Sequence, residues 1–182
     1  KELKGKKIAH TGKLTTANLL LNLYLDDFQA VELPFDKIID AVLGDEVDAG
    51  VLIHEGQITY EQSGLKKVVD FGKLLAVETN GLPLPLGLDV VRIDLGEDLA
   101  RRISRALKES IHYGYTHQSE SIPYALKFGR GIDQALGEKF VKMYVNELTV
   151  NMGERGKRAL EYLFRKAFKN KLLQSVPALE FM

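Results

Sequence analysis

A histidine that follows a short apolar segment is the residue in this sequence best suited to proton transfer. His54 comes directly after Val51, Leu52 and Ile53, which have the composition of a buried strand. Open parallel sheets bind ligands beyond the carboxyl ends of their strands, so His54 is expected at such an edge. Imidazole groups act as general bases near neutral pH, but they also serve as purely structural hydrogen-bonding groups. His54 is therefore the leading candidate for a catalytic base.

A second candidate site is the beginning of a helix near Thr15. A short strand is expected at residues 7–10 and a turn at residues 11–14, and apolar residues then recur at helical spacing up to about Leu25. The first turn of a helix has unpaired N–H groups at the positive end of the helix dipole, which bind carboxylates or phosphates. Thr15 or Thr16 would add a hydroxyl donor to such a site. The alternative is that Thr15 only caps the helix.

Composition excludes several classes of partner. The 25 basic and 25 acidic residues balance, so no net charge attracts the chain to nucleic acid or to an anionic membrane surface. There is no Cys, which excludes disulfides and thiolate zinc sites. Because there are only four His, we expect no metal site. No apolar run reaches the roughly 20 residues of a membrane span. We expect a cytoplasmic protein with a small-molecule partner, and neither nucleic acid nor membrane as a partner.

The first half of the chain alternates between short strands and short helices. Strands are predicted at residues 7–10, 31–33, 47–53 and 67–70, and helices at residues 15–25, 36–43 and 72–78. Such alternation predicts an α/β lobe with a mainly parallel sheet and right-handed crossovers. The alternating prolines of residues 81–87 then fix an extended segment, either a crossing between lobes or an ordinary rigid loop.

The second half of the chain is predicted to be helical. Helices are expected at residues 97–117, 122–128 and 133–147, followed by a last helix with an apolar face that includes Ala159, Leu160 and Leu163. These helices either pack on one another or cover a sheet supplied from elsewhere. We divide the chain into a complete α/β lobe at residues 5–84 and a second part at residues 85–182, which holds the return crossing and helices of a second lobe.

Four sequence blocks together resemble a known enzyme family. They are Thr-Thr-Ala-Asn-Leu-Leu at residues 15–20, Val-Asp-Ala-Gly-Val-Leu-Ile-His-Glu at 47–55, Leu-Pro-Leu-Pro-Leu-Gly at 82–87 and Met-Tyr-Val-Asn at 143–146. In this order they resemble the 1,4-dihydroxy-6-naphthoate synthases of the futalosine route to menaquinone. The resemblance implies a fold like type II periplasmic binding proteins, with two α/β lobes around a cleft. It also implies a cytoplasmic lyase that converts cyclic dehypoxanthine futalosine to 1,4-dihydroxy-6-naphthoate without a cofactor.

The resemblance assigns roles to the two candidate sites. His54 falls on the family's proposed catalytic base, and Thr16 with Ala17 falls on its segment that binds the carboxylate of the substrate. Residues 10–14, His-Thr-Gly-Lys-Leu, depart from the family, whose members usually have a turn with Pro-Gly-Arg there. Two alternative functions remain: a non-catalytic module of the same fold that binds a small anion, and a related lyase that acts on chorismate.

The family also implies more chain than this sequence contains. Its members carry a segment upstream of the position of Lys1, which builds the sheet of the other lobe. That sheet is therefore expected to be largely missing here, and the helices that would cover it could associate with a second copy.

Overall fold

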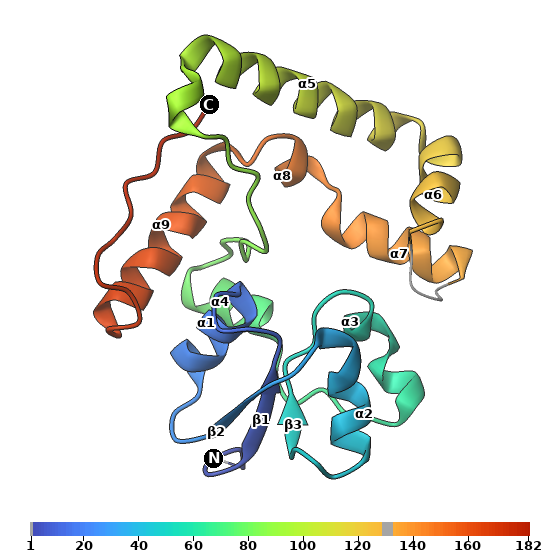
Figure 1. Ribbon diagram of the computed structural model, residues 1–182, viewed down its shortest axis with the longest axis vertical. Coiled ribbons are helices and arrows are strands. Elements are labelled where there is room, and N and C mark those ends of the chain that lie inside the picture. The colour runs from blue at the N-terminus through green and yellow to red at the C-terminus, as the bar shows by residue number, and fades with distance from the viewer. Residues whose placement is uncertain (1, 129–132) are drawn as a thin grey trace. The chain divides into compact units, whose positions relative to one another are not determined.

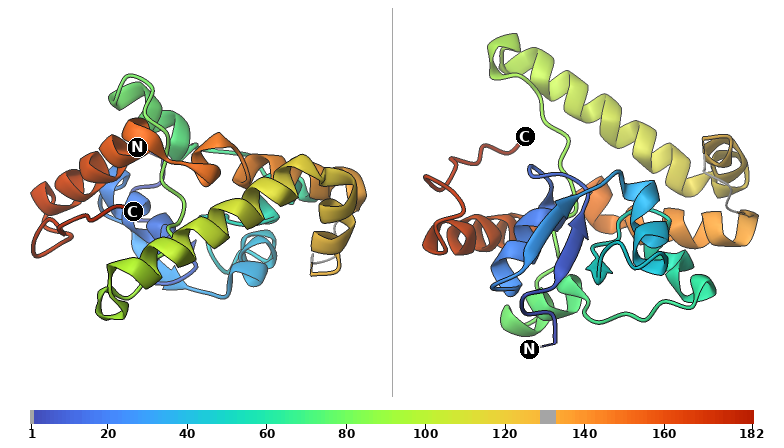
Figure 2. Two further views of the ribbon diagram at one scale, coloured as in Figure 1. Left: turned by 90° about the horizontal axis from the view of Figure 1, so that it is seen from above. Right: turned by 60° about the horizontal axis from the view of Figure 1, so that its bottom comes forward.

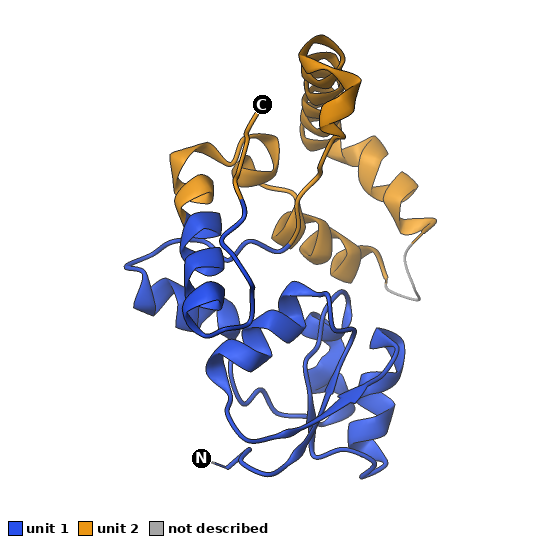
Figure 3. Ribbon diagram, turned by 60° about the vertical axis from the view of Figure 1, so that its left-hand side comes forward, with its two compact units in different colours: residues 1–86, 159–177 blue, residues 87–158, 178–182 orange. Residues whose placement is uncertain are grey.

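In the computed structural model, residues 2–128 and 133–182 are described, and the chain divides into two compact units (Figure 3). Unit 1 comprises Lys1–Leu86 and Ala159–Pro177, and unit 2 comprises Gly87–Arg158 and Ala178–Met182. The predicted division after residue 84 lies beside the first of these boundaries. The last helix, which the sequence prediction placed in the second part, is shared between the two units. Residues 129–132 of that second part lie outside the described residues.

A three-stranded parallel sheet forms the centre of unit 1 (Figure 1). Strand β1 (Lys7–His10) lies between β2 (Gln29–Glu32) and β3 (Ala49–Gly50). In register, Ala9 pairs with Val31 on one side and with Gly50 on the other. Figure 2 shows the strands side by side, and the prediction of a parallel sheet is confirmed.

The prediction of a strand at residues 67–70 is wrong. This segment has no regular secondary structure, and Val68 and Val69 are 63% and 41% exposed. A strand needs a neighbouring strand to pair its backbone groups, and the described part of the sheet offers none here. Likewise, only Ala49–Gly50 of the strand predicted at residues 47–53 pairs with β1 as regular strand.

Helices cover both faces of this sheet. Helix α1 (Thr16–Tyr24) connects β1 to β2, and the 3₁₀ turn η1 (Phe35–Lys37) with α2 (Ile38–Leu43) connects β2 to β3. Because β2 and β3 flank β1, right-handed crossovers place these two helices on opposite faces. On the α2 face, Ala9 packs with Ile38, Ala41 and Val47 in a buried cluster.

The rest of unit 1 contains three more short elements and the end of a long helix. Helix α3 (Gly56–Thr59) and the 3₁₀ turn η2 (Tyr60–Ser63) follow β3, and α4 (Phe71–Glu78) begins where the side chain of Asp70 accepts a hydrogen bond from the N–H of Lys73. The C-terminal part of α9 (Gly153–Lys169) belongs to this unit as well.

All the regular secondary structure in the described residues of unit 2 is helical. After the 3₁₀ turn η3 (Ile93–Leu95), it contains α5 (Glu97–Thr116), α6 (Gln118–Leu126), α7 (Gln134–Tyr144), α8 (Glu147–Val150) and the beginning of α9. The single helix predicted at residues 133–147 is divided, because Asn146 caps a new helix with its side chain. Helix α5 buries only Ala100, whereas Leu99, Ile103 and Leu107 on its apolar face are 39–41% exposed.

A polar cluster around Glu78 ties α9 to α1 and α4. The hydroxyl of Tyr24 donates to Oε2 of Glu78 at 2.7 Å, and the ammonium group of Lys166 donates to the same oxygen. Lys166 also lies 4.0 Å from the centroid of the Tyr24 ring. Partial burial disfavours the charged carboxylate, but hydrogen bonds from Lys166, Tyr24 and Tyr162 outweigh this, so the pKa of Glu78 is lowered. Burial and the nearby carboxylate raise the pKa of Tyr162 to about 12.

Glu78→Gln removes the charge that pairs with Lys166 and is expected to lower the free energy of unfolding at pH 7 by about 1 kcal/mol. The effect is no larger because the Glu78 side chain is 37% exposed and solvent screens the ion pair. Since the pKa of Glu78 is lowered in the folded protein, its contribution is complete above the ordinary value of 4.5 and is lost as the pH falls further. Urea unfolding at pH 7 and pH 3 measures both effects. Glu46→Gln is the control, since Glu46 is exposed and no side-chain contact is described for it. An equal loss at both pH values would show that the charge of Glu78 is not the stabilising feature.

Candidate functional site

The candidate site lies where the three strands of unit 1 end. Strand β1 ends at His10, β2 at Glu32 and β3 at Gly50, and all three point in the same direction. The backbone contacts continue briefly beyond the strands. The N–H of Leu33 donates to the carbonyl of His10 at 3.0 Å, and the N–H of Val51 donates to that of Ala9 at 2.9 Å. The loops that follow the strands therefore begin at a common edge, where ligands of open parallel sheets bind.

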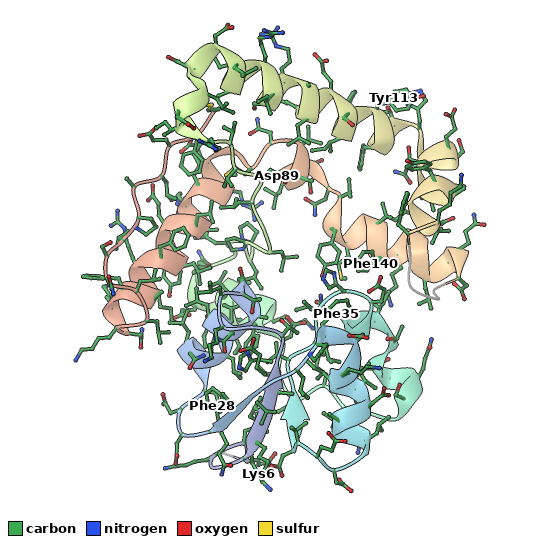
Figure 4. All side chains as sticks on the ribbon, viewed as in Figure 1. Lys6, Phe28, Phe35, Asp89, Tyr113 and Phe140 are labelled. Atoms are coloured by element: carbon green, nitrogen blue, oxygen red, sulfur yellow. The ribbon has the colours of Figure 1, made fainter. Side chains whose placement is uncertain are left out.

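A ring contact joins the loops that follow the two outer strands. The rings of Phe35 and His54 have their centroids 4.8 Å apart, with a tilt of 59° between their planes. Figure 4 labels Phe35 among the side chains of unit 1. Phe35 follows β2 and His54 follows β3, whereas β1 lies between these strands. The contact therefore joins the loops that follow the two strands flanking β1. Phe35 was not predicted as a site residue, and its only signal in the sequence is an aromatic residue directly after the proline that ends a predicted strand.

His54 has an unusual backbone conformation. Its φ angle is +53°, in the left-handed region that residues other than glycine rarely adopt, at a cost of roughly 1–2 kcal/mol. The next segment begins immediately, since the carbonyl of His54 accepts a hydrogen bond from the N–H of Gln57. The side chain is exposed, and no hydrogen bond of its imidazole is described. Strained conformations concentrate at functional sites, and an imidazole for which no hydrogen bond is described can form one with a ligand.

The first turn of α1 offers two unpaired donors. Thr15 is the N-cap: its Oγ1 accepts from the N–H of Asn18 at 3.1 Å and donates to the carbonyl of Gly12 at 2.8 Å. The Thr15 hydroxyl is thus already satisfied within the chain, as the capping alternative requires. No hydrogen bond is described for the N–H groups of Thr16 and Ala17, which are the first two residues of the helix. These two groups have the geometry that binds an anion.

Two buried polar groups lie at the end of β1 and directly after it. His10 is 3% exposed, and its Nδ1 accepts a hydrogen bond from the N–H of Gly12 at 3.2 Å. The Oγ1 atom of Thr11 is buried and has no hydrogen-bond partner among the described residues. A buried hydroxyl without a partner costs about 1–3 kcal/mol, so it requires an explanation. Thr11 was not singled out as a predicted site residue.

The structure places the predicted site residues at one edge of the sheet without joining them directly. His54 follows β3, and Thr15, Thr16 and Ala17 follow β1, its neighbour in the sheet. No described contact links His54 to the start of α1. Their predicted roles in catalysis and binding stay predictions. Among residues 2–128 and 133–182, no group of three or more His, Asp or Glu side chains is arranged to hold a metal ion. In the same residues, no helix is both long and apolar enough to span a membrane.

This chain belongs to the menaquinone biosynthesis family, whose model matches residues 1–169. Two relatives are named 1,4-dihydroxy-6-naphthoate synthase. The protein from Thermus thermophilus is 39% identical over 165 residues, which are 91% of this chain and 60% of the relative. The protein from Streptomyces coelicolor is 34% identical over 184 residues, covering 98% of this chain and 64% of the relative. The family resemblance noted from the sequence blocks is confirmed.

A solved structure has the same fold over nearly the whole chain. It is the crystal structure of a protein from Archaeoglobus fulgidus, 48% identical, with a TM-score of 0.90. The similarity covers 94% of this chain and 64% of that protein. This chain therefore spans less than two thirds of the length of each of these three relatives.

Proposed function

We propose that the protein containing this chain converts cyclic dehypoxanthine futalosine to 1,4-dihydroxy-6-naphthoate, as a carbon–carbon lyase of menaquinone biosynthesis in the cytoplasm. The observation that carries the proposal is the similarity to two proteins named as this synthase over 91% and 98% of the chain. The proposal includes the two-lobed fold of type II periplasmic binding proteins, with the α/β unit as one lobe. Self-association through the helices of residues 97–168 stays a further prediction.

The chemistry that we propose uses the two halves of the candidate site and no cofactor. The N–H groups of Thr16 and Ala17 bind the aryl carboxylate of the substrate, because they are unpaired and lie at the positive end of α1. His54, as a neutral imidazole, removes a proton from the bound substrate and so starts ring opening and fragmentation. Positioning and proton transfer both contribute, and general base catalysis typically contributes about 10²–10⁴-fold.

The test is incubation of the whole protein with cyclic dehypoxanthine futalosine, followed by detection of 1,4-dihydroxy-6-naphthoate. Formation of the product at a rate proportional to protein concentration supports the proposal. Binding of the substrate without turnover would instead identify a binding module for a small anion. Chorismate is tested in parallel, and turnover of chorismate alone would identify the related lyase.

Thr16→Pro is expected to weaken binding of 1,4-dihydroxy-6-naphthoate about tenfold while α1 stays folded. The substitution removes one of the two unpaired N–H groups, and a charge-assisted hydrogen bond contributes about 1.5 kcal/mol. Proline is tolerated at the first position of a helix, and the extended backbone of Thr15, with φ −103° and ψ 150°, suits a residue before proline. Calorimetric titration measures the dissociation constant.

Thr16→Val is the matched control for this substitution, because it removes the hydroxyl and keeps the N–H group. Its affinity is expected to stay within about twofold of the original. If Thr16→Val weakens binding as much as Thr16→Pro, the hydroxyl rather than the backbone holds the ligand. If neither substitution has an effect, the carboxylate does not bind at the start of α1.

A further inference from the structure

The buried histidine at the end of the central strand has a defined hydrogen-bonding role. Nδ1 of His10 accepts the hydrogen of the Gly12 N–H at 3.2 Å, so Nδ1 carries no proton and the neutral ring is protonated at Nε2. The side chain is 3% exposed. Apolar residues fill such positions more often, because a buried polar ring must be compensated by hydrogen bonds. The ring thus holds the backbone of the turn that leads into α1.

Three hydrogen bonds connect this ring to the first turn of the helix. The Gly12 N–H donates to His10, the Gly12 carbonyl accepts from Oγ1 of Thr15 at 2.8 Å, and Oγ1 of Thr15 accepts from the N–H of Asn18 at 3.1 Å. Gly12 is the central link, because its N–H and its carbonyl, which belong to the two peptide groups on either side of its Cα, both take part. Its backbone conformation therefore affects where the Thr15 cap lies, and with it the N–H groups of the next two residues.

Packing alone would not hold this turn in place. Leu14, its largest apolar residue, is fully exposed, and Lys13 is exposed too. Gly12 has a φ angle of +140°, which residues with a side chain rarely adopt. Because glycine has no side chain, the backbone at this position can also take other conformations. A loop with few apolar contacts depends on its hydrogen bonds for a single conformation.

The neighbouring Thr11 is consistent with a turn that is held ready for a ligand. Its Oγ1 is buried and has no partner among the described residues. The unpartnered hydroxyl thus lies in the turn that joins β1 to the start of α1.

We propose that His10 is a positioning residue of the anion site. Its Nδ1 accepts from the N–H of Gly12 and so restrains the backbone at Gly12, the carbonyl of Gly12 holds the Thr15 cap, and the cap holds the N–H groups of Thr16 and Ala17 where a carboxylate binds. The proposal rests on the proposed function only in that the ligand is taken to be a carboxylate. His10 itself does not touch the reacting atoms in this role.

The test compares three substitutions that differ in where they place an acceptor. His10→Asn keeps an acceptor near the position of Nδ1, His10→Gln moves the amide one bond farther along the side chain, and His10→Leu removes it. We expect His10→Leu and His10→Gln to weaken binding of 1,4-dihydroxy-6-naphthoate about tenfold, since a hydrogen bond is lost and the turn becomes less ordered. His10→Asn is expected to stay within about threefold of the original affinity.

Amide hydrogen exchange in the ligand-free protein separates this proposal from the proposed function. In His10→Leu, the amides of Gly12 and Asn18 should exchange about tenfold faster, and in His10→Asn at nearly the original rate. If the unsubstituted protein does not bind the naphthoate, the proposed function fails, and the exchange rates still decide the role of His10. If the amide exchange rates and the affinities of all three variants equal those of the unsubstituted protein, the proposal is overturned. An Asn variant as defective as the Leu variant, with both folded by circular dichroism, would overturn it too.

Discussion

His54→Gln is expected to lower kcat of the whole protein by about 10²–10⁴-fold and to change the affinity for the substrate little. The glutamine amide can donate and accept a hydrogen bond, so it can keep a contact with the substrate, but it cannot accept a proton. The imidazole is exposed, and its only described side-chain contact is the Phe35 ring, so the structure offers no hydrogen bond for the substitution to break. Steady-state kinetics for both proteins, with substrate binding measured separately, give the two quantities.

Two further variants make the result for His54 specific. His112→Gln is the matched control, because His112 is an exposed residue of α5 for which no side-chain contact is described, and its turnover should be unchanged. His54→Asn tests the backbone, since asparagine adopts positive φ angles more readily than glutamine does. Loss of turnover in both His54 variants points to the missing base. Near-normal turnover in both would return His54 to a structural role, and a defect in the Gln variant alone would assign the effect to backbone strain.

Gly50→Ala is expected to destabilise unit 1 by about 1–3 kcal/mol. A methyl group at this position would lie 2.2 Å from Cγ2 of Ile38 and 3.6 Å from the side chains of Ala9 and Val42. Ile38 is fully buried in α2, so it has no free space into which it can move. Because β3 continues directly toward His54, a displaced strand should also reduce turnover. Chemical denaturation at equilibrium measures the loss of stability.

The clash at Gly50 predicts a compensating substitution. Ile38→Leu keeps the side-chain volume but removes the methyl group on Cβ, so the double variant with Gly50→Ala should be more stable than the sum of the single effects, by about 1 kcal/mol. Gly87→Ala is the control, since no atom lies within 4 Å of the added methyl group there. Additive effects in the double variant would show that the contact with Ile38 is not the source of the strain.

The local pattern of the sequence determined the elements of the α/β unit and the beginning of the site. The apolar residues around Ala9 and the helical spacing after Thr15 predicted β1 and α1, and α1 begins at Thr16 with Thr15 as its cap. Such features follow from residues within one or two turns of each other, so no distant contact is needed to predict them. The position of His54 beyond an apolar segment is of the same kind.

The tertiary structure decided which loops meet. Phe35 and His54 are separated by a helix and a strand in the sequence, and they come together only because the sheet order is β2-β1-β3. The same order places β1 between two strands and accounts for the burial of His10 at its end. Residues 67–70 show the reverse case, since an apolar pattern becomes a strand only where another strand is available to pair with it. Local sequence thus determined where helices and strands begin, whereas strand order, which depends on contacts between distant residues, determined the composition of the site.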